Sequence, residues 1–123
     1  MSDTEKKPLR VLFCMAVLQN FFDLPNEEIG TVFKSVNVML ADLAAMEGVT
    51  VLGTMDDDML MVGTSPNGWP WTCYVLADCA DIETVTAACG LFRTTPVGQH
   101  HRLWRYMRIE ARVGRPLDLP NPA

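Results

Sequence analysis

Residues 91–112, "LFRTTPVGQHHRLWRYMRIEAR", contain the side chains best suited to chemistry. Histidine titrates near neutral pH, so His100 or His101 could exchange a proton with a substrate as the catalytic residue. Two neighbouring side chains on an extended segment diverge, and at most one of them is expected to point into a site. Both histidines could instead be solvated loop residues.

Arginines in the same segment could bind an anion. Arg93 and Arg108 could each hold a ligand carboxylate with a two-pronged hydrogen bond. Arg93 could equally complement the negative end of a helix, and Arg108 could belong to a salt-bridge chain with Glu110 and Arg112. Six of the ten basic residues lie in the last third of the chain, which allows a local anion-attracting patch.

Aromatic side chains gather in two segments of the chain. They could form a flat apolar slot for an aromatic ligand, or fill the core and a dimer interface. These residues are Trp69, Trp71, Tyr74, Trp104 and Tyr106. The predicted substrate-binding residues are Arg93, Trp104, Tyr106, Arg108 and Tyr74, and the expected ligand is a small aromatic carboxylate.

The remaining motifs predict neither a metal nor a cofactor. The consecutive carboxylates at residues 56–58 point in different directions, and the other oxygen ligands of a Ca²⁺ loop are missing. Phosphate-loop, nucleophile-elbow and dinucleotide motifs are absent from the sequence. Haem held by His100 or His101 is an alternative. The four cysteines lack C-x-x-C spacing and are expected to be reduced, buried thiols.

Composition restricts the class of protein. With 49% apolar and 20% charged residues, and no apolar run of about 20 residues, the chain is expected to be globular and outside the membrane. A net charge of −5 argues against a nucleic-acid partner. The polar N-terminus and the absence of a small-residue cleavage pattern predict no signal peptide and a cytoplasmic location.

The hydrophobic pattern predicts an α+β fold. Strands are expected at residues 9–18, 49–55, 59–63, 71–77 and 103–113, with helices from Pro25 to Gly48 and from Asp81 to Phe92. This order matches the ferredoxin-like βαββαβ plan with one added hairpin strand at residues 59–63. The domain would span residues 9–113, between a disordered segment 1–8 and a proline-rich tail 114–123.

Both helices should cover one face of an antiparallel sheet. The opposite face is not polar enough to be left in water, so the pattern predicts a homodimer with two sheets packed face to face. Alternation along residues 103–113 directs one set of side chains to the helices and the other to the helix-free face. The helix-free set is Trp104, Tyr106, Arg108, Glu110 and Arg112.

Several stretches carry a family resemblance. "DIETVTAACGLFRTTPVG" and "LWRYMRIEARVGRPL", with "RVLFCMAV" and "DDDMLMVG...WPWTCYVLAD", resemble the IacB-type proteins of bacterial indole-3-acetic acid (auxin) degradation. The ending of helix, "GLF", loop and strand resembles the dimeric α/β-barrel superfamily, which includes muconolactone isomerases and small monooxygenases. The superfamily resemblance agrees with the homodimer predicted from the helix-free face, and the first hypothesis is a cofactor-independent enzyme acting on an oxidised indole-acetate intermediate. A non-catalytic accessory protein that binds such an intermediate, or a partner enzyme, is the alternative.

Overall fold

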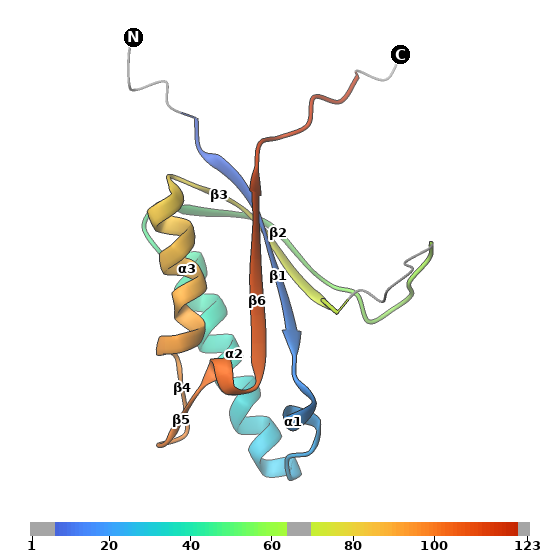
Figure 1. Ribbon diagram of the computed structural model, residues 1–123, viewed down its shortest axis with the longest axis vertical. Coiled ribbons are helices and arrows are strands. Elements are labelled where there is room, and N and C mark those ends of the chain that lie inside the picture. Colours follow the sequence, from blue (N-terminus) through green and yellow to red (C-terminus); the bar gives the residue numbers. More distant parts are fainter. Residues whose placement is uncertain (1–6, 64–69, 121–123) are drawn as a thin grey trace.

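The computed structural model describes residues 7–63 and 70–120, which fold into two layers (Figure 1). One layer is an antiparallel sheet of four strands, β1 (Leu9–Val17), β2 (Val49–Asp56), β3 (Cys73–Cys79) and β6 (Met107–Gly114). Their order across the sheet is β2-β3-β1-β6. The other layer contains the helices α2 (Asn26–Ala45) and α3 (Ile82–Thr94), both on one face of the sheet. This arrangement confirms the predicted ferredoxin-like α+β fold.

The two long helices lie close to the predicted ranges, although α2 begins after Pro25 and ends at Ala45, and α3 continues past Phe92 to Thr94. Pro25 precedes α2 with a φ of −59°, and Glu27 and Glu28 lie in its first turn near the positive end of the helix dipole. After α2, Gly48 adopts a φ of +87°, a conformation that favours glycine, and the chain turns into β2. Asp81 caps α3 because its side chain accepts a hydrogen bond of 2.8 Å from the Thr84 backbone N–H.

The core lies between the helices and the sheet. Phe13 on β1 is fully buried, and so are the inward residues of β3 at alternate positions. From the helices, Met39, Leu43 and Phe92 pack into the same cluster, each at most 2% exposed. The three- and four-residue spacing of these positions gathers them on the sides of α2 and α3 that face the sheet.

Four short elements were not predicted. α1 (Gln19–Phe22) follows β1, and the two-residue strands β4 (Pro96–Val97) and β5 (His101–Arg102) form a small hairpin. The Ser35 hydroxyl on α2 donates a 2.8 Å hydrogen bond to the Pro96 carbonyl and fastens the hairpin to the helix layer. A 3₁₀ turn, η2 (Leu103–Arg105), leads into β6.

Two predicted strand assignments are wrong. Residues 59–63 form no strand, and residues 59–62 expose four consecutive apolar side chains. The pairing between the segment after β2 and the segment before β3 ends at the hydrogen bond from the Asp57 N–H to the Thr72 carbonyl (2.9 Å). Beyond Asp57 the chain therefore has no neighbouring strand among the described residues with which to form backbone hydrogen bonds. The closing strand also begins later than predicted, because residues 103–105 form η2. The predicted loop at 64–68, Trp69 and residues 1–6 lie outside the described residues.

The helix-free face of the sheet has an apolar centre between paired charges. Leu12 on β1 lies opposite Leu76 on β3, and Cys14 lies opposite Tyr74. Along the same face, the Arg10 Nε lies 2.7 Å from the Asp78 Oδ1. Within the described ranges, no helix combines the length and the apolar character that crossing a bilayer requires.

Candidate functional site

The predicted site residues divide among three hollows of the surface. The largest, about 750 Å³, runs along the edge strand β6, and we call it the β6 groove. It contains three of the predicted residues, together with two aromatic side chains and a thiol. These lining residues are Arg93, Trp104, Arg108, Trp71, Phe92 and Cys89.

Arg93 and Trp104 meet in the β6 groove. Arg93 lies in the last turn of α3, and Trp104 is the middle residue of η2. The Arg93 guanidinium carbon lies 5.9 Å from the centre of the Trp104 ring, within the range of a cation–π contact. Trp104 is 58% exposed, so its ring is available to a ligand as well as to the guanidinium. A cation beside an exposed aromatic surface suits a ligand that combines a ring with an anionic group.

Arg108 approaches the groove from the other side of β6. Side chains alternate along a strand, and the neighbours Met107 and Ile109 pack with the core beneath the helices. Arg108 therefore belongs to the helix-free side of the strand. Among residues 7–63 and 70–120, no carboxylate lies within ion-pair distance of Arg93 or Arg108. Both guanidinium groups remain available to an anion.

The predicted salt-bridge chain on β6 is shorter than expected. Glu110 pairs with Arg112 at 2.6 Å, and both side chains are about half exposed. Arg108 is not part of this pair, although Glu110 also lines the groove. Because the Glu110 carboxylate already has a cationic partner, it opposes anion binding in the groove less than a free carboxylate would.

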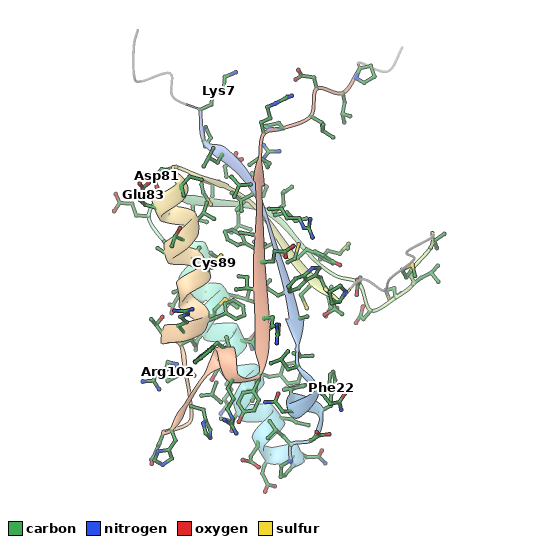
Figure 2. All side chains as sticks on the ribbon, in the orientation of Figure 1. Lys7, Phe22, Asp81, Glu83, Cys89 and Arg102 are labelled. Carbon is green, nitrogen blue, oxygen red and sulfur yellow. The ribbon has the colours of Figure 1, made fainter. Side chains whose placement is uncertain are left out.

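Trp71 and Cys89 also line the groove but were not among the predicted site residues. Trp71 belongs to the aromatic segment before β3, and Cys89 lies on α3, where Figure 2 labels it midway along the helix. Burial raises the pKa of the Cys89 thiol. The thiol is therefore a weak nucleophile at neutral pH and acts as part of the apolar wall. Its place in the inward stripe of α3 was the signal that could have located it.

The histidines lie in a different hollow, which we call the hairpin hollow, of about 250 Å³. The turn between β4 and β5 carries His100, and His101 begins β5. Both side chains are exposed, and the His101 ring meets the Tyr106 ring edge to face at 6.3 Å. Glu28 and Thr31 on α2 line the opposite wall. The hairpin hollow and the β6 groove share no lining residue among the described ones.

Tyr106 does not face the helix-free side, so its predicted orientation is wrong. The 3₁₀ turn shifts the alternation by one residue, and Tyr106 is buried in the core beneath the hairpin, at 6% exposure. Leu103 remains inward because it begins the turn, and Arg105, predicted to face the helices, is exposed.

Tyr74 lies in a third hollow, of about 430 Å³, on the helix-free face. Leu12, Met55 and Leu76 line the same space, which we call the sheet-face hollow. The Tyr74 hydroxyl is 3.2 Å from the Asp57 Oδ2 and 3.0 Å from the Trp71 carbonyl, and it can donate to either. Tyr74 therefore supports the segment that carries Trp71 but does not itself line the β6 groove.

Comparison with known proteins gives a fold likeness. No protein-family model matches the chain, and no curated protein matches it. Among solved structures, a mutant chlorite dismutase from Candidatus Nitrospira defluvii superposes with a TM-score of 0.53 over 94% of this chain. The chain shares the fold of a chlorite dismutase. At 12% identity this likeness concerns the fold alone, and the chain spans about half of the chlorite dismutase, 46% of its length.

The chlorite dismutase likeness leaves the chemistry of the site to this chain's own residues. Within the described part of the chain, no group of three or more histidine, cysteine, aspartate or glutamate side chains is arranged to hold a metal ion. The four cysteines are free, with Cys14 and Cys79 buried and Cys73 and Cys89 partly buried. What the site offers is aromatic surface, two unpaired guanidinium groups and, in a separate hollow, two histidines.

Proposed function

We propose that this protein acts in indole-3-acetic acid catabolism and binds an oxidised indole-acetate intermediate in the β6 groove. The observation that carries the proposal is the Arg93 guanidinium 5.9 Å from the Trp104 ring, in the same groove as Arg108. An indole-acetate combines a flat ring with a carboxylate. The ring can stack on Trp104 or Trp71, and either arginine can hold the carboxylate.

The separation of the two hollows favours a binding role over catalysis in the β6 groove. A general acid or base must come within about 3 Å of the proton that it transfers. His100 and His101 line the hairpin hollow and not the groove. An accessory protein that holds the intermediate, or presents it to a partner enzyme, needs no proton-transfer group beside the ligand.

A cofactor-independent enzyme is the second candidate, and the hairpin hollow favours it. There, His100 and His101 share one space with the Glu28 carboxylate and the Thr31 hydroxyl. This set contains groups that can donate and accept protons. A small substrate in the hairpin hollow would be within reach of either histidine, with Tyr106 also lining the hollow.

The proposal includes a cytoplasmic homodimer. The helix-free face has an apolar centre around Leu12 and Leu76. Beside it Arg10 pairs with Asp78 and Glu110 with Arg112, whereas Arg108 on the same side has no ion-pair partner among the described residues. Paired charges can be covered by a second copy at a smaller cost than isolated ones. We infer that two sheets pack face to face.

Titration with matched ligands tests the binding proposal. The purified protein is titrated with indole-3-acetate, 2-oxoindole-3-acetate and 3-methylindole, and tryptophan fluorescence and calorimetry report binding. The two carboxylates should bind, and 3-methylindole, which lacks the carboxylate, should bind at least tenfold more weakly. Equal affinity for all three ligands, or no binding at all, would contradict the proposal.

Turnover separates the two candidates. The same carboxylates are incubated with the wild-type protein and with the His100→Ala/His101→Ala variant, and products are followed by chromatography. Saturable turnover that the variant loses would assign catalysis to the hairpin hollow. Binding without turnover in either protein would support the accessory role. An absorption spectrum without a Soret band would remove the haem alternative.

A further inference from the structure

The loop after β2 carries an unusual exposed apolar run. We call residues 57–63, the described part of the loop between β2 and β3, the arm. Residues 59–62 read Met-Leu-Met-Val, and Met59 is 90% and Val62 83% exposed. In Figure 1 the arm extends from the sheet on the side away from α2 and α3. Four consecutive apolar side chains in water imply a surface that covers them.

The base of the arm is fixed in position. The Asp57 N–H donates to the Thr72 carbonyl at 2.9 Å, and the Tyr74 hydroxyl lies 3.2 Å from the Asp57 carboxylate. The arm begins two residues after Met55, which lines the sheet-face hollow. The acidic residues 56–58 therefore connect the apolar surface of the helix-free face to that of the arm.

The area of the sheet face favours a second copy that uses the arm. Four strands about 4.8 Å apart and about eight residues long cover roughly 500 Å². A stable interface buries about 800 Å² on each partner. Four buried aliphatic side chains add on the order of 300 Å². The accessible surface of the face exceeds this flat area, and the arm adds further apolar surface that a second copy can bury.

Strand register places the base of the arm and Arg108 at the same end of the sheet. Asp56 lies level with Cys73, Cys73 with Met15, and Met15 with Ile109, so the base of the arm and Arg108 are at the same end of the sheet but on opposite edges. In face-to-face packing, a two-fold axis parallel to the strands brings the β2 edge of one copy over the β6 edge of the other. The acidic residues 56–58 then come near the partner's unpaired Arg108.

We propose that in the homodimer each arm crosses onto the β6 edge of its partner and closes the helix-free side of the partner's β6 groove. The apolar residues 59–62 cover the edge strand, and the acidic base of the arm lies beside Arg108. A guanidinium has five N–H donors, so Arg108 can serve the partner's carboxylate and a ligand carboxylate together. In this arrangement the partner supplies one wall of the groove. This inference rests on the homodimer and the groove proposed above.

Sedimentation equilibrium tests the contribution of the arm to the dimer. The Met59→Ser/Leu60→Ser/Met61→Ser variant should dissociate at least tenfold more readily than wild type, with an unchanged circular dichroism spectrum because these side chains lie outside the core. The control is Val38→Ser/Ile82→Ser, which removes two apolar side chains that are about half exposed on the helix layer and should dimerise like wild type. Equal dimerisation of the arm variant and wild type would overturn the inference and leave the ligand proposal standing.

Disulfide trapping tests which copy the arm contacts. A Leu60→Cys protein is mixed with a Glu110→Cys protein under mild oxidation, and a disulfide-linked heterodimer is expected on non-reducing gels. A Val38→Cys protein mixed with the Glu110→Cys protein is the control and should not link. Should the Leu60→Cys/Glu110→Cys double variant form its disulfide within one chain instead, the arm folds onto its own sheet and the inference fails. A wild-type protein that remains monomeric at about 100 μM would remove both the dimer and the arm contact, whereas ligand titration would still test the groove.

Discussion

Arg93 and Trp104 come from different elements, the last turn of α3 and η2, and meet with the guanidinium carbon 5.9 Å from the ring centre. Between them the chain makes the β4–β5 hairpin, which brings it back beneath the end of the helix. The cation beside Trp104 therefore depends on a hairpin of two-residue strands. This relationship connects the fold to the proposed ligand.

Replacing Arg93 should weaken binding of indole-acetate ligands more than replacing a nearby arginine outside the groove. Arg93→Met removes charge-assisted hydrogen bonds and should raise the dissociation constant roughly ten- to a hundredfold. Arg102→Met is the matched control, because Arg102 is exposed on β5, donates to the His101 carbonyl at 3.1 Å and does not line the β6 groove. Calorimetric titration of both variants checks the prediction, which an equal loss of affinity would contradict.

A bound ligand should protect Cys89 from alkylation. Cys89 lines the β6 groove, whereas Cys73 is partly buried on β3 and does not line it. Saturating 2-oxoindole-3-acetate should slow iodoacetamide labelling of Cys89 several-fold and leave Cys73 unchanged, as read by peptide mass spectrometry. Equal protection of both thiols would indicate a general stabilisation of the fold and not occupation of the groove.

The periodicity of apolar residues predicted the long helices and strands, because each of them buries one side against the core. The inward positions of α2 and α3 recur at helical spacing, and the Asp81 cap is visible in the sequence. The same reasoning could not find β4 and β5, since two-residue strands have no period. It also missed η2. Leu103 and Tyr106 are both buried, whereas alternation along a strand would place residues three apart on opposite faces. A short apolar run in the sequence does not show that the chain makes a 3₁₀ turn at this point.

Prediction of the site was limited by the separation of the hollows. Arg93, Trp104 and Arg108 were predicted to share a site, and the structure brings them together. The histidines and Tyr74 lie in two other spaces, because the hairpin turns His100 and His101 toward α2 and because Tyr74 occupies the centre of the helix-free face. The two histidines are close to Trp104 in the sequence, but this closeness does not show on which side of the hairpin their side chains lie.

Removing the cap of α3 should destabilise the whole domain. Asp81 accepts hydrogen bonds from the Thr84 N–H at 2.8 Å and from the Thr84 hydroxyl at 2.7 Å. Asp81→Ala should lower the free energy of unfolding by about 1 kcal/mol, whereas Asp81→Asn keeps an acceptor and should cost less. Urea denaturation followed by circular dichroism measures both changes. Asp118→Ala, an exposed change in the C-terminal tail, is the control and should have no effect.

Stability should fall as the pH rises into the range where thiols titrate. Burial is the main cause that raises the pKa of Cys73, Cys79 and Cys89, with nearby aspartates adding to the effect at Cys73 and Cys79. A thiol with a higher pKa in the folded state stays protonated after its unfolded counterpart has ionised. The unfolded state then binds fewer protons, so the free energy of unfolding decreases with pH above roughly 8.5.

Comparing the wild-type protein with a variant that lacks two of these three thiols isolates this effect from the titration of lysine and tyrosine. Between pH 7.5 and 10, the free energy of unfolding should decrease less steeply in Cys73→Ala/Cys89→Ala than in wild type, even though the variant starts from a lower value because it has lost buried volume. Urea denaturation under reducing conditions at each pH gives both slopes. Parallel slopes would mean that these thiols ionise as readily in the folded protein as in the unfolded chain, contrary to the burial that the fold imposes on them.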